Sequence, residues 1–343
     1  DYPRTEKTNE PSFTQNWLSN NKNKIAQLIV QAREVNKFHG TFLSSIMKYQ
    51  VNGRIHGEIQ QLRSDSGGTV SGRLSMSNPN LQQVPARNKD FGPKIRSLFI
   101  PEEGFKWGSF DYSQQEPRMT VHYAASIGDG YEGSNELVEA YHNTEADFHQ
   151  TVADLVGIER SQAKTIGLGL MYGMGKNKLA LSLGVSKDEA DQLIVKYNNK
   201  VPFVKKLSDR CKFAADEKGV IRTKKGRKCR FDMWETKDFG LHVAEKFDDA
   251  VAKYGKDNIK RAYTYKALNR LIQGSSADQT KQAMLDCYDA GHLPMLQIHD
   301  ELCFNIKDDA HANEIKKIME NAIEFKVPSV VDKGIGESWG DAK

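Results

Sequence analysis

Two acidic segments, each directly after an apolar run, could bind the metal ions that assist phosphoryl transfer. The run "FKWGSFD" ends at Asp111, and "LQIHDELCF" places His299, Asp300 and Glu301 between two apolar stretches. Strand periodicity puts each aspartate at the end of a strand. If the strands are neighbours, their carboxylates can bind two Mg²⁺ ions about 3.5 to 4 Å apart, the arrangement for in-line displacement at phosphorus. An isolated "HDE" is more typical of a polar hairpin turn than of a metal site, so other features must decide.

A second pattern lies between these segments, in "RSQAKTIGLGLMYG". It places four residues at intervals of four: Arg160, Lys164, Leu168 and Tyr172. On a helix they form one slanting stripe, cationic at one end and apolar and aromatic at the other. This stripe suits a nucleoside triphosphate, with the cations on the phosphates. An amphipathic core helix would explain the same spacing. Gly167 and Gly169 favour the binding site, since each costs a helix about 1 kcal/mol relative to alanine and indicates close approach or motion.

Composition narrows the protein class. The 343 residues are 38% hydrophobic and 27% charged, enough for a substantial core and two or three packed subregions. Apolar runs are too short for a membrane span and no signal peptide opens the chain, so a cytoplasmic location and no membrane partner are expected. Four cysteines without a CxxC pair indicate neither a zinc site nor a disulfide framework. The run "RTKKGRKCR" (222–230) indicates either polyanion binding or a solvated hairpin.

The candidate residues need a sheet and a set of helices to position them. Apolar periodicity predicts strands at 94–100 and 105–111, then a helix at 113–126 whose first turn tolerates Pro117. Further helical patterns follow at 160–172, 186–200, 203–218, 241–262 and 309–325, with a helix pair across 264–290. Hairpins are expected around Lys225 and Gly226 and at the "HDE" turn.

The N-terminal third predicts two helices and a loop. Apolar spacing favours two helices within 24–50, separated near Gly40. The Ser-, Gly-, Asn- and Pro-rich segment 64–85 is expected to be an extended surface loop. The chain begins at Asp1 rather than Met, and we expect it to be a fragment of something longer.

Three motifs, in order, resemble those of a known enzyme family. "DYSQQEPR", "RSQAKTIGLGLMYG" and "QIHDEL" closely resemble motifs A, B and C of family A DNA polymerases, the DNA polymerase I-like enzymes, and especially their bacteriophage members. Similar segments also occur elsewhere: "SGRLSMSNPNLQQVP", "DFHQTVADLVG", "KKGRKCRFDMWE", "ALNRLIQGSSAD" and "IGESWGDAK". The resemblance extends over about residues 25 to 343.

The resemblance implies an α+β right-hand polymerase fold, with an antiparallel palm sheet, helical fingers and a truncated helical thumb. The implied divisions are a partial thumb at 1–63, palm with the primer–template loop and motif A at 64–126, fingers with motif B at 127–265, and palm with motif C at 266–343. Too few residues precede motif A for an exonuclease domain and a full thumb, so we expect neither proofreading nor the thumb tip in this chain.

Catalytic and metal-binding roles follow from the same resemblance. Asp111 and Asp300 match the two metal carboxylates, with the backbone carbonyl of Tyr112 as a third ligand; Lys164 matches a proton donor to pyrophosphate, and Glu301 would assist. Two Mg²⁺ ions are implied as cofactors, with Mn²⁺ as a substitute. The implied partners are primer–template DNA, dNTPs and phage replication proteins, in the host cytoplasm if the chain is phage-encoded.

Substrate contacts are implied as well. The nucleotide-binding set is Tyr112, Gln114, Glu116, His149, Arg160, Lys164, Leu168 and Tyr172. In it Glu116 acts as a steric gate against a ribose 2′-hydroxyl, and Tyr172 guards the templating position. The DNA-binding set, which senses pair shape through the minor groove, is Arg73, Asn269, Gln273 and His299. Without the resemblance, Glu116 would be interpreted as a solvated glutamate, His149 as structural and Arg73 as an exposed loop residue.

The expected reaction is template-directed DNA synthesis in phage replication, in which a primer 3′-hydroxyl attacks the α phosphate of a dNTP as the fingers close. A single-subunit RNA polymerase has a similar fingers helix, although Glu116 and "HDE" favour DNA synthesis. An inactive DNA-binding fragment is a second alternative. A two-metal nuclease would not need the triphosphate stripe. Tyr265, where many cellular members have an arginine, leaves one strand contact in doubt.

Leu168 generates a prediction about chain terminators. Family members usually carry Phe or Tyr at this position, so aromatic stacking on the incoming sugar is lost, and no hydroxyl replaces a missing 3′-hydroxyl. We expect strong rejection of dideoxynucleotides, measured as termination bands in primer extension with mixed dNTPs and ddNTPs. Ready dideoxy termination would contradict this.

Overall fold

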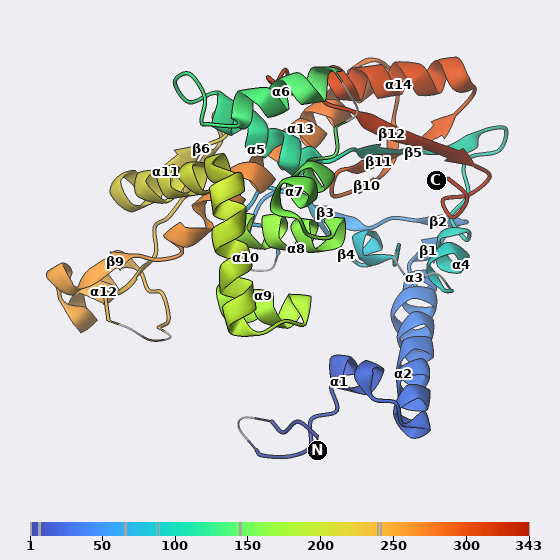
Figure 1. Cartoon of the computed structure of the whole chain (residues 1–343). Coiled ribbons are helices and arrows are strands. Elements are labelled where there is room, and N and C mark those ends of the chain that lie inside the picture. Colours follow the sequence, from blue (N-terminus) through green and yellow to red (C-terminus); the bar gives the residue numbers. More distant parts are fainter. Residues whose placement is uncertain are drawn as a thin grey trace.

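A four-stranded antiparallel sheet forms the centre of the chain. The computed structural model describes residues 2–5, 8–64, 67–86, 88, 90–143, 146–238, 240 and 242–342. Within them, the largest sheet has the strand order β10-β11-β5-β12 (Figure 1). Its strands are β5 (Lys106–Tyr112), β10 (Pro294–Ile298), β11 (Glu301–Ile306) and β12 (Val331–Gly336). The strand predicted at 105–111 and the "HDE" hairpin are thus confirmed, β5 running one residue further than expected.

Both faces of this sheet are covered. Phe110, Leu302 and Phe304 pack into one cluster with α13 (Ala267–Asp289) and α14 (Asp309–Asn321). On the opposite face, Trp107 and Cys303 join a second cluster. A shift of one residue would exchange the two sets of side chains between faces, so burial on both sides strongly specifies the register.

The residues after β5 form a helical half with its own core. It contains α5 (Gln115–Ala125), α6 (Ser134–Asn143), α7 (Phe148–Val156), α8 (Arg160–Met171), α9 (Lys176–Leu183), α10 (Lys187–Lys200) and α11 (Pro202–Lys218). Tyr197, Phe203 and Ile166 are at most 1% exposed and lie in its core. The predictions of helices at 113–126, 160–172, 186–200 and 203–218 are confirmed.

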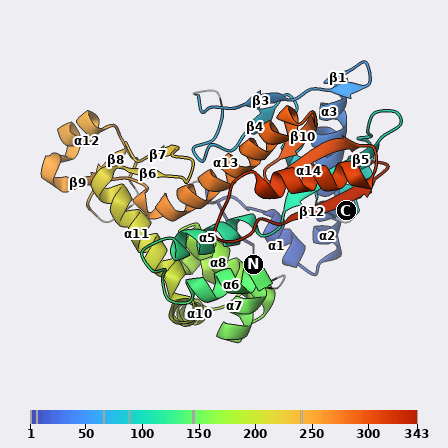
Figure 2. The ribbon, with the colours of Figure 1, turned by 90° about the horizontal axis from the view of Figure 1, so that it is seen from above.

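Beyond α11 the chain forms short hairpins around a small helix. The strands are β6 (Val220–Arg222), β7 (Lys228–Arg230), β8 (Trp234–Thr236) and β9 (Ile259–Arg261). The helix predicted at 241–262 is reduced to α12 (Phe247–Tyr254), because Gly255, at φ +80°, ends it before a 3-10 turn and β9. Figure 2 shows α12 and β9 at one end of the molecule, away from the central sheet.

The N-terminal helices project from the rest in Figure 1. They are α1 (Gln15–Asn20), α2 (Lys24–Lys37), a π-helical segment (Phe38–Ser44) and α3 (Ser45–Met47), followed by β1 (Gln50–Val51) and β2 (Arg54–Ile55). The break expected near Gly40 is therefore wrong. The chain stays helical, and Phe38, Phe42 and Ile46 lie buried in one cluster.

Three other sequence expectations are wrong. The segment 64–85, of which residues 65 and 66 lie outside the described residues, is partly a core element: β4 (Ser75–Ser77) pairs with β3 (Glu58–Gln60), and Leu74, Met76 and Leu81 are buried. The strand expected at 94–100 is replaced by α4 (Gly92–Arg96), where Pro93 occupies a favourable first-turn position. The helix pair expected across 264–290 is one helix, α13, preceded by a 3-10 turn (Thr264–Lys266).

Gly274 lies within α13, although glycine weakens helices, because a larger residue would not fit there. A Cβ at this position would lie 2.7 Å from Nη2 of Arg227 and 3.2 Å from the Thr223 side chain. The glycine therefore allows the basic hairpin β6–β7 to dock directly on the helix.

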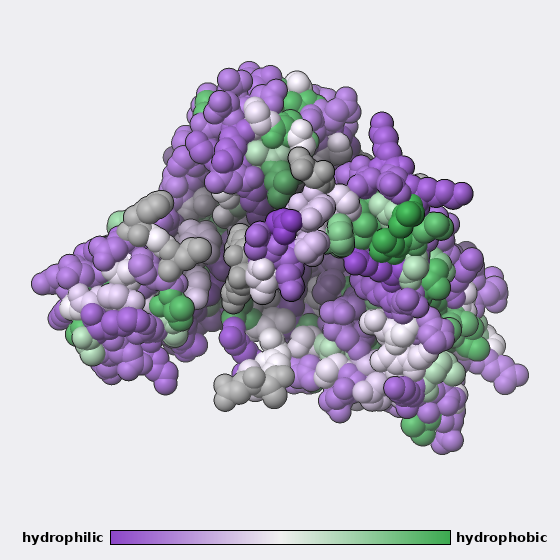
Figure 3. Space-filling view, turned by 90° about the horizontal axis from the view of Figure 1, so that it is seen from below, coloured by the Kyte–Doolittle hydropathy of each residue, from purple (hydrophilic) through white to green (hydrophobic). Residues whose placement is uncertain are grey.

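Two whole-chain observations complete the fold. No helix in the described residues is long and apolar enough to cross a membrane. The face of the molecule seen from below is mostly hydrophilic and is hollowed between its lobes (Figure 3).

The buried sheet gives a stability prediction. Phe110 is 0% exposed and meets Phe304 edge-on at 5.6 Å between ring centroids. We expect Phe110→Ala to lower the free energy of unfolding by about 3 to 5 kcal/mol, because a large cavity opens in the sheet. Urea denaturation measures this. The control is Phe213→Ala on α11, 67% exposed, which should change stability little; equal losses would contradict the assignment of Phe110 to the core.

Candidate functional site

The site begins where the β10–β11 hairpin meets the end of β5. The hairpin turns at His299 and Asp300, with His299 in the left-handed region at φ +56°. Glu301 pairs with Asp111 across the strands, and the backbone N–H of Tyr112 approaches the carbonyl oxygen of Asp300 at 3.4 Å. The sheet register thus brings the two predicted carboxylates, Asp111 and Asp300, to the same edge.

Burial and neighbouring charges raise the pKa of both carboxyls. The pKa of Asp111 is raised to about 7. The main cause is partial burial of the carboxyl, although the residue as a whole is exposed, and the charges of Asp300, Glu301 and Asp332 add to it. Burial is also the main cause that raises the pKa of Asp300, to which the charge of Glu116 adds. A divalent cation would relieve this repulsion, and oxygen donors are the ligands that Mg²⁺ prefers.

Metal binding here would involve few side chains. In the described parts of the chain, no group of three or more His, Cys, Asp or Glu residues is arranged to hold a metal ion. The donors that the sheet edge offers are the carboxylates of Asp111 and Asp300 with nearby backbone oxygens. Such an open set leaves coordination positions for waters or substrate phosphates, as is usual for Mg²⁺.

Glu301 is held within the protein. Its Oε1 accepts hydrogen bonds from Ser109 Oγ and from Nε1 of Trp339, the latter at 3.2 Å. These contacts anchor the start of β11 beside Asp111. The predicted assisting role of Glu301 therefore rests on its charge and on the strand it fixes.

Arg96 is a neighbour that sequence reasoning missed. Its guanidinium lies 4.2 Å over the ring of Trp339, and burial lowers its pKa against the opposing charges of Glu301, Cys303 and Asp111. It supplies positive charge beside the carboxylates. Sequence reasoning missed Arg96 because it predicted a strand at 94–100. In the structure Arg96 is the last residue of the helix α4, and its guanidinium lies over Trp339.

A polar network centred on Glu116 joins four of the predicted residues. Arg73 Nη2 lies 2.8 Å from Oε1 of Glu116, and the Tyr172 hydroxyl donates to Oε2. Gln273, on α13, hydrogen-bonds to Tyr172, and Asn269 lies one turn earlier on the same helix. Segments distant in sequence therefore converge on one carboxylate.

His299 lies near this network. Burial, and then the positive charge of Arg73, lower the pKa of His299, whereas Asp300 opposes the shift. The electrostatic influence of Arg73 extends to Asp300 as well. The Glu116 network and the carboxylate edge are thus adjoining parts of one site.

The predicted phosphate-binding residues also come together. Arg160 binds Oδ2 of Asp147 through Nη2 at 2.5 Å and Nε at 2.8 Å. His149, on α7, is 4% exposed, and burial is the main cause that lowers its pKa to about 4. The charge of Asp147 opposes this shift, whereas the charges of Lys164 and Arg160 add to it. The buried Nδ1 of His149 has no hydrogen-bond partner among the described residues. Lys164 is exposed.

The glycines of α8 allow close packing. A Cβ on Gly167 would lie 3.2 Å from the Tyr197 hydroxyl, and one on Gly169 would lie 3.1 Å from Sδ of Met174. Leu168 between them is partly buried against the helical core. Close approach is therefore one use of these glycines, as the sequence indicates.

Two predicted nucleotide contacts are directed elsewhere. The Gln114 amide accepts from the backbone N–H of Phe148 at 2.9 Å and donates to the carbonyl of Ala146 at 3.2 Å, so it joins the end of β5 to the start of α7. The Tyr112 ring is buried, and its hydroxyl donates to the carbonyl of Met319 at 2.6 Å. Both side chains therefore make hydrogen bonds within the protein, and their predicted contacts with a nucleotide stay predictions.

Tyr265 and the basic hairpin (222–230) both pack against neighbouring parts of the protein. Tyr265 packs beside Gly173, where a Cβ would lie 3.0 Å from its ring. In the hairpin, Arg227 Nε binds Asp278 at 2.6 Å and Lys225 donates to Gln282 at 2.8 Å. Part of the basic run therefore faces α13, so the hairpin is not simply solvated.

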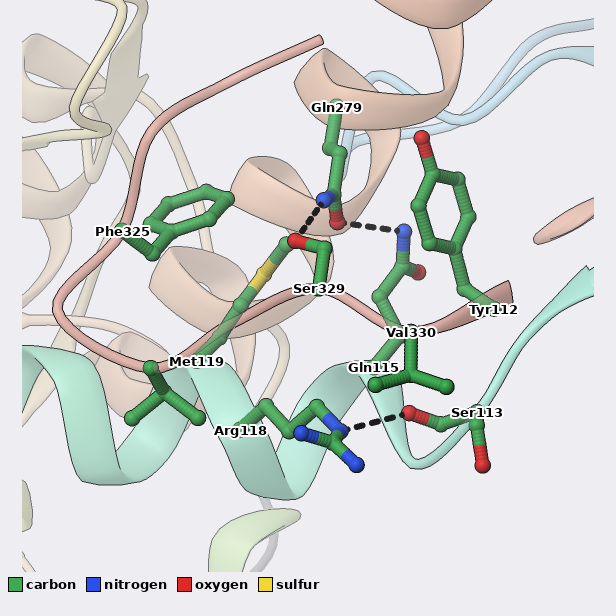
Figure 4. A pocket seen from close by; sticks show the side chains of 10 residues that line it. Tyr112, Ser113, Gln115, Arg118, Met119, Gln279, Phe325, Ser329 and Val330 are labelled. Atoms are coloured by element: carbon green, nitrogen blue, oxygen red, sulfur yellow. Dashed lines mark hydrogen bonds between the residues drawn. The ribbon is translucent and has the colours of Figure 1, made fainter. Parts of the chain in front are cut away.

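A small cavity behind β5 lies apart from this chemistry (Figure 4). Gln115 donates to Gln279, which donates to Ser329, and Arg118 donates to the carbonyl of Ser113. The cavity volume is about 10 Å³, room for at most one water. The cavity is too small to hold a nucleotide.

The pKa of Asp111 predicts how stability depends on pH without metal. In the unfolded chain the pKa of Asp111 is about 3.9, the usual value for aspartate. In the folded protein its pKa is about 7. Its contribution to stability is fully present below the unfolded value and is lost as pH rises through the folded value. Urea unfolding in EDTA at pH 5 and pH 8 should therefore show a smaller decline for Asp111→Asn than for the unaltered protein. Asp209→Asn, a surface carboxylate on α11, should keep the original decline; an unchanged decline in Asp111→Asn would contradict the shift.

Comparison with known proteins agrees with this geometry. The sequence model of DNA polymerase family A matches residues 2–341. A DNA-directed DNA polymerase of Pseudomonas phage M6 is 39% identical over 96% of this chain and 54% of its own length. The thermostable DNA polymerase I of Thermus filiformis is 31% identical over 99% of this chain and 39% of its own length. The chain thus spans about half the length, or less, of the curated relatives it matches.

A solved structure is similar over nearly the whole chain. The POL domain of Pol1 from M. smegmatis, in complex with DNA primer–template and dNTP, superposes with a TM-score of 0.79 and 27% identity, covering 99% of this chain and 59% of that one. Its fold is the same mixture of helices and antiparallel sheet, which confirms the predicted α+β polymerase fold. This chain therefore belongs to DNA polymerase family A.

Proposed function

We propose that the chain is the core of a DNA-directed DNA polymerase, which adds dNTPs to a primer 3′-hydroxyl and releases pyrophosphate. The observation that carries the proposal is the meeting of Asp111 and Asp300 at one sheet edge, where burial raises the pKa of both carboxyls and the charge of Asp300 adds to the shift of Asp111. The phage relative is named as a DNA-directed DNA polymerase, and the M. smegmatis domain binds primer–template and dNTP. Both names support the same activity here.

Divalent cations fit this edge. Membership of family A implies a general dependence on divalent metal, and the mutually repelling carboxylates suit two Mg²⁺ ions, or Mn²⁺ in their place. Asp111, Asp300 and the backbone carbonyl of Tyr112 would hold them. When bound, such ions lower the pKa of a hydroxyl nucleophile and stabilise charge on the leaving phosphates.

The helical side would bind the triphosphate. Arg160 and Lys164 would neutralise phosphate charge as it moves towards pyrophosphate, and Lys164 would donate the proton to the leaving group. His149, with its ring neutral, would donate one further hydrogen bond to the same phosphates. Glu116, held by Arg73 and Tyr172, would lie against the sugar and exclude a 2′-hydroxyl.

The remaining polar residues would bind DNA. Arg73, Gln273, Asn269 and His299 would contact the last base pair from the minor groove, where correct pairs present nearly common acceptors. The hydrophilic, hollowed face in Figure 3 is consistent with a nucleic-acid surface. The proposed divisions are partial thumb at 1–63, palm at 64–126 and 266–343, and fingers at 127–265. Phage replication proteins are proposed as further partners, in the host cytoplasm.

Primer extension tests the proposal. A short primed template with Mg²⁺ should be extended by dNTPs and not by rNTPs, and Asp300→Asn should abolish extension, because one metal carboxylate is lost. Extension preferring rNTPs would identify an RNA polymerase instead. DNA binding without any extension would identify a binding fragment, and degradation of the primer with Mg²⁺ alone would identify a nuclease.

A further inference from the structure

Asp147 joins the two helices that carry the phosphate-binding residues. Its Oδ1 accepts from the backbone N–H groups of His149 at 2.9 Å and Gln150 at 3.1 Å, so it caps the N-terminus of α7. Its Oδ2 accepts both bonds from Arg160, at the first residue of α8. One carboxylate therefore has two separate tasks, one on each helix.

The geometry leaves part of Arg160 available. A guanidinium has five N–H donors, and Asp147 engages the edge formed by Nε and Nη2. The donors on Nη1 point from the other edge, which suits a second anion such as a phosphate. Holding one edge restricts the rotation of a long side chain that would otherwise lose conformational freedom on binding.

The cap places a second group in the same region. Asp147 lies two residues before His149, and Lys164 lies one turn after Arg160 on α8. The charges of Lys164 and Arg160 both act on the His149 ring. The carboxylate thus sets the positions of a ring, a guanidinium and, through α8, an ammonium relative to one another.

We propose that Asp147 is a positioning residue for the triphosphate of the incoming nucleotide, holding Arg160 by one edge so that the other edge meets the phosphates. The inference rests on the proposed role of Arg160. It assigns to Asp147 a role in nucleotide affinity and no contact with the nucleotide itself. The ion pair is partly exposed, with side chains 47% and 31% accessible, so its contribution to fold stability is small.

Asp147→Asn separates the two tasks. Asparagine caps a helix as well as aspartate does, so α7 should keep its N-terminus, while the charge that holds Arg160 is lost. The matched control is Asp308→Asn, where the aspartate caps α14 through the N–H of His311 at 2.8 Å. Among the residues that the structure describes, no arginine forms an ion pair with Asp308. The two variants should have similar melting temperatures.

The experiment measures dNTP binding without chemistry. Protein, Mg²⁺ and template are combined with a primer synthesised without a 3′-hydroxyl, and the dissociation constant of the next correct dNTP is read from stabilisation of the ternary complex. Asp147→Asn should weaken binding about threefold to tenfold, and Asp308→Asn should not. In single-nucleotide insertion, KM should rise by a similar factor with kcat within about twofold.

Arg160→Ala and the double variant complete the test. If Asp147 acts through Arg160, the double variant binds dNTP no more weakly than Arg160→Ala alone. If Arg160→Ala leaves affinity unchanged, the proposed triphosphate site itself is wrong. If Arg160→Ala weakens binding and Asp147→Asn does not, or strengthens it, the site stands and the positioning role is overturned.

Discussion

The pairing register of β5 with β11 is the constraint on which the site depends. It places Glu301 opposite Asp111 and turns the chain so that Asp300 lies beside both. Gathering carboxylates in this way is unfavourable in the absence of a cation, because each ionised group raises the pKa of its neighbours. The arrangement persists since the strands are buried on both faces, and a register shift of one residue would move Phe110, Leu302 and Phe304 to the opposite face of the sheet.

The surrounding polar groups limit this repulsion without removing it. Arg96 brings positive charge beside Glu301 and Asp111, and Ser109 and Trp339 bind the Glu301 carboxylate. Glu301 is thereby fixed as part of the strand edge. Asp111 and Asp300 lie beside it at the same edge, and burial raises the pKa of both.

The helix α13 connects this centre to the helical half. Its residues contact the Glu116 network through Gln273, the basic hairpin through Asp278, and the palm sheet through its buried face. Gly274 lets the Arg227 guanidinium lie against the helix. A single long element therefore sets the distance between the sheet edge and the residues that would meet DNA.

The sequence by itself determined the family and the fold class and supplied most of the candidate site residues, because ordered motifs with characteristic side chains are local features of the chain. Hydrophobic periodicity located β5, the "HDE" hairpin and the long helices for the same reason. It failed where tertiary contacts decide: at 94–100, where Pro93 and burial of Ile95 favour a helix, and at 64–85, where apolar residues pack against the palm.

Only the tertiary structure decided which polar side chains meet. Gln114 and Tyr112 lie next to Asp111 in sequence, yet the side chain of Gln114 binds backbone near the start of α7 and that of Tyr112 binds the end of α14. Arg96 lies in none of the segments that resemble the family, Asp147 is the first residue of one of them, and each acquires its partners through packing between separate elements. Sequence spacing orders side chains along one strand or helix, whereas contacts across elements depend on register and packing, which the whole chain sets together.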